Sequence, residues 1–274
     1  MASTGEKPIP EFSAPPVMET VLGVEFARLE NWAVPYFGIF WNEVKEQFPK
    51  YSVKPPLDPQ VEQFDKPKPS SGPQISLLSE PEIRCLFIDS DDRTLIQVQG
   101  NRFTYNWLKT GPADSYPHYN EGIRPAFERA WGQFSEFVQG NHLGQVNVVQ
   151  CEVTYINHLE VGKGWHAASD LAGVFPCWLG KTSGGFLPPP ENVGFDVIYR
   201  IPNETGRLRV SMKPAIRNED GAEILQLTLT ARGKPAGSDL ESVLSWLDMG
   251  RQWVVRGFTD FTSSQMHRLW ERST

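Results

Sequence analysis

The sequence is poor in cysteine: it holds three, Cys85, Cys151 and Cys177, and none of them forms a CxxC pair. Each lies among apolar residues, so we expect buried free thiols in a reducing compartment rather than disulfides or a zinc site. No apolar run approaches the roughly 18 residues that a membrane-spanning helix needs. The Pro-rich N-terminus has no apolar signal core. These absences predict a cytoplasmic protein that neither spans nor binds a membrane.

Basic residues are also in deficit. The formal net charge is -7 and the isoelectric point is about 5.3. A protein that grips the phosphate backbone of nucleic acid needs a basic footprint, so the balance disfavours nucleic acid as a partner.

Motifs that carry catalysis are missing as well. The sequence contains no GxxxxGK[ST] phosphate loop and no GxSxG nucleophile elbow. His166 and Asp170 have the i, i+4 spacing of a metal pair, but no third ligand accompanies them. Glu152 would serve as a general base if it were buried, yet a strand carboxylate among arginines is more typical of an ion pair. We therefore expect a non-enzymatic protein with no metal and no cofactor.

What the chain does have is an order of elements that recurs. A strand, a helical or irregular segment, three strands and an amphipathic helix appear once before residue 144 and once after it. The predicted strands cover 17–27, 82–89, 93–99 and 102–109, then 145–157, 194–201, 207–213 and 222–232. Gly100-Asn101 is a two-residue hairpin signal between two of them. We expect one domain over 17–274, built from two pseudo-repeats, 17–144 and 145–274.

Apolar stripes at helical spacing predict the helices. One runs from Phe37 to Phe48 after a cap at Asn31, and a second covers 123–138. A third begins at Ser238, and a final short helix follows a cap at Thr262 or Ser263. Ser238 and Glu241 have the spacing of a capping box.

Three further segments have no such period. Residues 1–16 should form a disordered tail, and the Pro-rich 52–78 and 180–192 should form long loops.

Antiparallel hairpins with helices on one face define an α+β fold. We expect a large antiparallel sheet with pseudo-two-fold symmetry, of the TATA-binding-protein or helix-grip type. That analogy concerns the fold and carries no function.

One face of this sheet should be polar. Alternate residues of a strand point to opposite sides, and the apolar set of each strand must pack under the helices. The opposite set is rich in Gln, Asn, Thr and Arg, and includes Gln150 and Arg207. Arg and Asn bind planar polar groups in a bidentate manner. The candidate binding residues are Gln97, Gln99, Arg102, Asn106, Glu152, Arg209 and Arg232.

Several stretches resemble a sporadically distributed prokaryotic family of unknown function. The resemblance rests on the runs from Leu95 to Trp107, from Glu152 to Asn157 and from Leu229 to Arg232, and covers about residues 15–272. It implies no activity and no catalytic residue. The scattered distribution of the family hints at a defence or toxin–antitoxin setting.

The function expected from these patterns is binding of a protein partner, or of a second copy, through the polar sheet face. One alternative is a small-molecule sensor or enzyme with a pocket between sheet and helices, closed by the loops at 52–78 and 180–192. A second is a nucleic-acid-binding sheet. A polar face that only meets solvent is the simplest explanation of the pattern.

Overall fold

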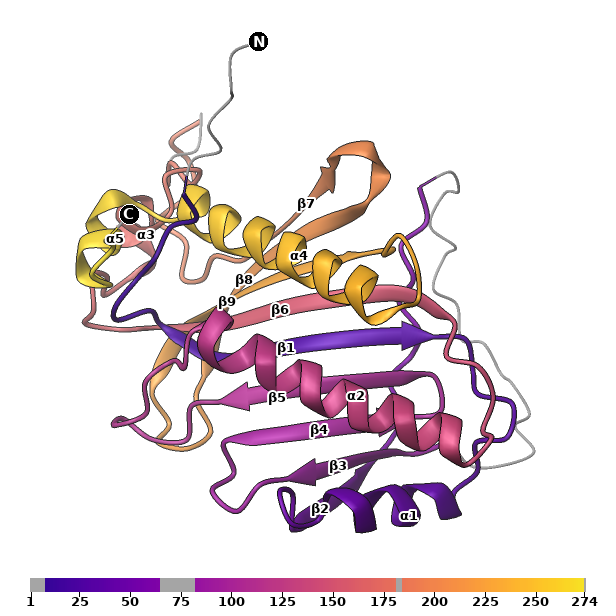
Figure 1. The fold of residues 1–274 in the computed structure, drawn as a ribbon. Coiled ribbons are helices and arrows are strands. Elements are labelled where there is room, and N and C mark those ends of the chain that lie inside the picture. The colour runs from indigo at the N-terminus through magenta and orange to yellow at the C-terminus, as the bar shows by residue number, and fades with distance from the viewer. Residues whose placement is uncertain (1–7, 65–81, 181–183, 274) are drawn as a thin grey trace.

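The computed structural model of the chain describes residues 8–64, 82–180 and 184–273. A curved nine-stranded antiparallel sheet with the order β2-β3-β4-β5-β1-β6-β9-β8-β7 forms its centre (Figure 1). The strands are β1 (Val17–Phe26), β2 (Lys50–Lys54), β3 (Arg84–Ile88), β4 (Thr94–Gln99), β5 (Arg102–Leu108), β6 (Val148–Glu160), β7 (Phe195–Ile201), β8 (Gly206–Ile216) and β9 (Glu223–Gly233). The sheet is continuous through both halves of the chain because β1 pairs with β6. The expected α+β class and large antiparallel sheet are confirmed.

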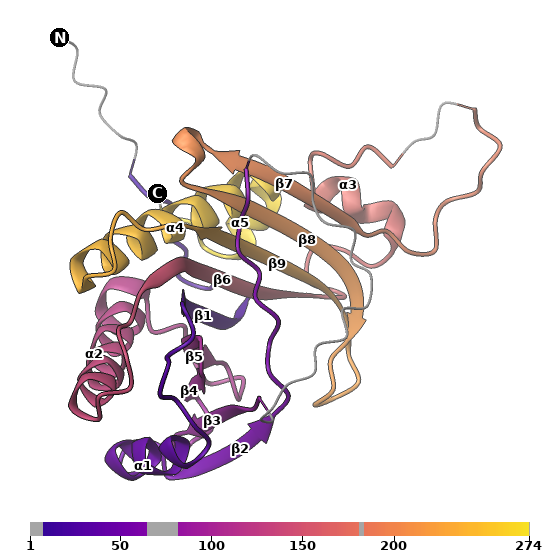
Figure 2. The same cartoon turned by 90° about the vertical axis from the view of Figure 1, so that its right-hand side faces the viewer.

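The helices are α1 (Pro35–Val44), α2 (Arg124–Gly140), α3 (Leu171–Val174), α4 (Leu240–Phe261) and α5 (Ser264–Leu269), and a π-helical turn, Tyr119–Ile123, precedes α2. α1, α2 and α4 all lie on one face of the sheet, and no helix of the described residues lies on the opposite face (Figure 2). No helix in the described ranges is both long and apolar enough to cross a membrane.

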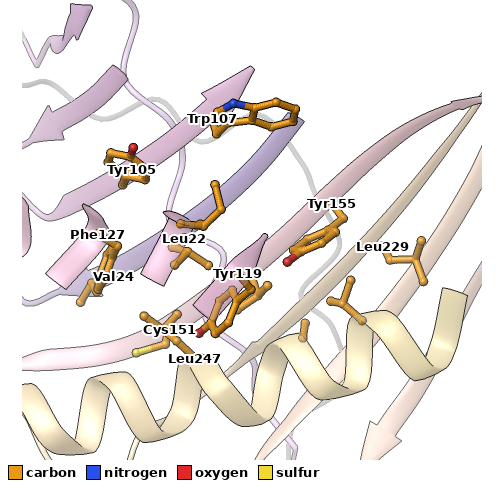
Figure 3. Packing of buried hydrophobic residues seen from close by; sticks show 14 of the residues in the cluster. Leu22, Val24, Tyr105, Trp107, Tyr119, Phe127, Cys151, Tyr155, Leu229 and Leu247 are labelled. Atoms are coloured by element: carbon orange, nitrogen blue, oxygen red, sulfur yellow. The ribbon is translucent and has the colours of Figure 1, made fainter. Parts of the chain in front are cut away.

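The hydrophobic core fills the space between these helices and the sheet. Leu22 and Val24 of β1 and Cys151 of β6 lie on the side of the sheet that faces Leu247 of α4 and Phe127 of α2 (Figure 3). Leu229 of β9 faces a later part of α4, near Gly257. The stripe predicted for 123–138 is the buried side of α2, as the apolar period requires.

Hydrogen bonds identify the residues that cap α4 and α5. The N-cap of α4 is Asp239, whose carboxylate accepts from the amide of Ser242 at 2.8 Å, so the capping box expected at Ser238 is wrong. The Ser238 hydroxyl instead accepts from the amide of Val148 at 2.9 Å. Ser263 caps α5, as one of the two expected residues.

The cap expected at Asn31 is also wrong. α1 begins at Pro35 after Val34, and the Asn31 amide donates to the carbonyl of His142 at 3.0 Å. Phe48 is fully buried although α1 ends at Val44, so the chain after the helix continues the apolar stripe.

Two segments differ from the expected loops and tails. Residues 8–16, expected to be disordered, lie against the end of the domain, where Phe12 is 8% exposed and packs on Phe258 and Trp270. Lys50–Lys54 forms the edge strand β2, which the expected loop at 52–78 overlaps. Residues 65–81 of that loop and residues 1–7 of the tail lie outside the described residues.

Candidate functional site: a polar sheet face covered by a strap

The face of the sheet opposite the helices carries the polar set that alternation predicts. In the register of the sheet, Gln99 lies beside Arg102, Arg102 beside Glu25 and Glu25 beside Gln150. Arg232 lies beside both Glu152 and Arg207. These residues therefore form a row across neighbouring strands at one end of the sheet.

Glu25 is the centre of that row. Its carboxylate accepts from Arg102 at 2.6 Å and from the side-chain amide of Gln150 at 3.0 Å. Glu25 is 6% exposed and Gln150 2% exposed. A buried carboxylate requires such partners, because an unpaired charge away from water is costly.

Glu152 and Arg232 form a second pair, with Arg232 Nε 2.5 Å from Glu152 Oε2. The strand carboxylate is thus an ion-pair partner, and not a free general base. Next to it the hydroxyls of Thr154 and Thr230 lie 2.8 Å apart.

Gln97 and Asn106 belong to a third group farther along the strands. Gln97 donates to Asn106 at 3.0 Å, and Asn106 donates to the Glu19 carboxylate at 2.6 Å. Burial raises the pKa of Glu19, and the hydrogen bond from Asn106 partly offsets that rise. These two residues do not join the row around Glu25.

The row is covered by the chain itself. After β2 the segment Pro55–Phe64, which we call the strap, crosses the polar face from the β2 side toward β7 (Figure 2). Its main chain is held by side chains of the sheet. Gln99 accepts from the amide of Leu57 at 2.9 Å and donates to the carbonyl of the same residue at 3.1 Å. One side-chain amide thus satisfies both main-chain groups of one residue.

Gln150 of β6 holds the strap main chain in a similar way, but through two residues. It accepts from the amide of Glu62 at 2.9 Å and donates to the carbonyl of Gln60 at 2.9 Å. Between the two glutamines, the amide of Gln60 donates to Glu25 at 3.3 Å. The side chain of Gln60 meets Arg232.

The C-terminal part of the strap, from Glu62 to Phe64, is bound by arginine side chains of β7 and β8. The Glu62 carboxylate, 5% exposed, accepts from Arg207 at 2.5 Å and from Arg209 at 2.7 Å and 3.0 Å. The ring of Phe64 lies 4.3 Å from the guanidinium carbon of Arg207 and 5.5 Å from that of Arg200. These distances suit cation–π contacts.

Three prolines favour an extended conformation of the strap. Pro55, Pro56 and Pro59 fix φ near −65° and bias the residues before them to extended conformations. The strap therefore loses little conformational freedom when it lies on the sheet.

The candidate residues are thus divided. Gln99, Arg209 and Arg232 contact the strap directly, and so does Arg102, which donates to the carbonyl of Asp58 at 3.4 Å. Glu152 positions Arg232, and Gln97 and Asn106 lie apart. Sequence reasoning missed Glu25 and Glu62 and did not select Gln150 and Arg207. The signal available for Glu62 was an acid in a Pro-rich segment opposite a face with several arginines.

The other candidate chemistry lies elsewhere. The Asp170 carboxylate accepts from the main-chain amides of His166 and Ala167 at 2.8 Å and 3.0 Å, which makes it a local turn residue. In the residues that the structure describes, no group of three or more His, Cys, Asp or Glu could hold a metal ion.

The cysteines agree with the expectation except at one position. Cys85 and Cys151 are buried, and burial raises the pKa of the Cys85 thiol to about 11. Cys177 is exposed, at a cleft of about 520 Å³ between α4 and β7.

The pocket expected between sheet and helices cannot be closed by residues 55–64, because the strap lies on the opposite face. A separate cleft of about 620 Å³ is lined by His166 and Pro189–Val193, together with the last residues of β8 and the first residues of β9. Neither Asp170 nor Glu152 lines it.

Comparison with known proteins does not assign the chain to a family. No protein-family model matches the chain, and no curated protein matches it.

Proposed function

We propose that this chain is a non-enzymatic binding protein that holds an extended segment of a protein partner, or of a second copy, against the polar face of its sheet. The observation that carries the proposal is the strap, an extended peptide already seated on that face through its main-chain groups. Gln99 and Gln150 pair with main-chain N–H and C=O groups as a neighbouring strand would. Because every polypeptide offers these groups, the same clamps suit a segment from another chain.

The pattern of charge supports a peptide over nucleic acid. Two of the arginines on the row are paired by carboxylates of the sheet itself, Arg102 by Glu25 and Arg232 by Glu152. A phosphate backbone would place further anions beside these acids, and like charges at close range are unfavourable. A peptide brings only the charges of selected side chains.

We also propose that the two halves are pseudo-repeats of the TATA-binding-protein or helix-grip type. Support comes from the central pair, in which β1 neighbours β5 and β6 neighbours β9, while α2 and α4 each follow the last strand of a half. β2 has no counterpart, and α3 is much shorter than α1. On this view the sheet is a saddle whose polar side is shaped to receive an elongated partner.

A peptide-display selection tests the proposed function. The bait is the full chain with residues 55–64 replaced by a Gly/Ser sequence of the same length, which uncovers the row. Random extended peptides should be enriched on this bait, and the enrichment should be lost when Gln99→Ala and Gln150→Ala are added.

Gln226→Ala in the same bait is the matched control, because Gln226 lies on the polar face and bonds Thr228 rather than the strap. This control should keep the enrichment. A folded bait, judged by circular dichroism, that enriches no peptide would rule out binding through this face.

A further inference from the structure

The geometry points to a specific ligand class: an extended, proline-containing peptide with a glutamate followed two residues later by an aromatic residue, for which the strap is a built-in stand-in. This inference rests on the proposed function, and it adds the recognised sequence and the competition with the strap.

The glutamate requirement follows from two arginines that the strap alone neutralises. In the described residues, the carboxylate bonded to Arg207 and Arg209 is that of Glu62. Arg209 contacts one carboxylate oxygen through two nitrogens, and Arg207 contacts the other oxygen. Such a site selects a planar carboxylate and rejects a lysine, which would add a third positive charge.

The aromatic requirement follows from the position of Phe64. Its ring lies against the guanidinium groups of Arg207 and Arg200. Arg207 therefore bonds the Glu62 carboxylate and contacts the Phe64 ring at the same time. An aliphatic side chain at this place would lose the attraction between cation and ring face.

The order of the contacts along the strap fixes the direction of the peptide, because Leu57 is bonded by Gln99 of β4 and Glu62 by Arg207 and Arg209 of β8. From β4 to β7 there are six strand steps, about 29 Å along a flat sheet at about 4.8 Å per step. The path from Leu57 to Phe64 covers about 23 Å at about 3.3 Å per residue, which suffices on the inner side of a curved sheet. A ligand therefore runs with its proline-containing part over β4 and β5 and its glutamate over β8.

The strap must be displaced before such a peptide binds, because both use the same glutamines and arginines. A tethered segment has an effective concentration in about the millimolar range, so the intact chain should bind free peptide weakly. Release of the strap exposes the whole row at once.

Fluorescence anisotropy with a labelled peptide of sequence PPLDPQVEQF, residues 55–64 of this chain, tests the inference. It should bind the chain with the Gly/Ser replacement saturably, and the unaltered chain at least about tenfold more weakly. Should the replacement disturb folding, Glu62→Lys in the full chain releases the strap by repulsion from Arg207 and Arg209, and should give the same tighter binding.

The peptide variants locate the specificity. A peptide with glutamine in place of Glu62 should bind at least about tenfold more weakly, because it lacks the carboxylate. A peptide with alanine in place of Phe64 should lose less affinity, because only the contact between ring and guanidinium is removed. Asparagine at the place of Asp58 is the matched control, since this side chain is exposed, and it should leave binding unchanged.

The outcomes separate the two proposals. If the strap peptide fails to bind either released chain while display selects peptides of another kind, the ligand class is wrong and the proposed function stands. If neither the strap peptide nor any displayed peptide binds, both are wrong. Saturable binding of a single-stranded oligonucleotide to the released chain, with no peptide bound, would overturn both in favour of nucleic acid.

Discussion

Glu62→Gln should loosen the strap by an amount that the structure allows us to work out. The carboxylate is 5% exposed and is bonded by two guanidinium groups that are 18% and 29% exposed. Hydrogen bonds to charged groups contribute about 1.5–3 kcal/mol each. The glutamine keeps one acceptor oxygen and the arginines regain some water, so the loss should be about 2–4 kcal/mol.

Hydrogen exchange measures this loss directly. The amides of Leu57 and of residue 62 are protected by the side chains of Gln99 and Gln150. Since about 1.4 kcal/mol is a factor of ten, their exchange should accelerate about 30- to 1000-fold, up to the rate of a free peptide. Asp58→Asn removes the same charge from an exposed strap residue and should change little.

The strap must also open separately from the rest of the sheet if it stands in for a ligand. In the unaltered protein, the amide of Leu57 should therefore exchange faster, and with a weaker dependence on urea, than core amides such as that of Leu22. Equal protection and equal urea dependence at both places would refute the reasoning, because the strap would then be part of one cooperative unit.

Two further predictions concern stability. Gly233→Ala should lower the free energy of unfolding in urea by more than about 2 kcal/mol, because an added Cβ would collide with the carbonyl oxygen of Thr205. Gly132→Ala meets nothing within 4 Å and should not destabilise the protein. Burial, and next the charge of Arg272, lower the pKa of His267, so its contribution to stability is complete above its unfolded value of about 6.5 and is lost as the pH falls below it. The melting temperature should fall less between pH 7 and 5 in His267→Gln; an unchanged fall would contradict this assignment.

The main elements were predictable because their signals are local. Alternation at Glu152 and Val153 indicated which side of β6 faces the helices, and the aromatic stripe near Trp131 indicated α2. The cap of α4 was misjudged by one residue, since Ser238 and Asp239 are both good caps. A contact with Val148, 90 residues away, decides between them.

The strap was not predictable from its own sequence. Its residues have no apolar period, and β2 before it is short and mostly exposed. The groups that hold it come from strands between Glu25 and Arg232, so its path depends on the finished sheet. The sequence therefore indicated a polar face, but could not indicate that the chain lies across it.

The pairing of β1 with β6 has a consequence for synthesis of the chain. β1 can complete a five-stranded sheet with β2–β5 before residues 148–160 leave the ribosome, and until then its other edge has no neighbour. Open edges invite pairing with other nascent chains, and charged side chains on an edge discourage it. Glu19 and Glu25 place two carboxylates on β1, and charges of this kind make an uncovered edge a poorer partner for other strands.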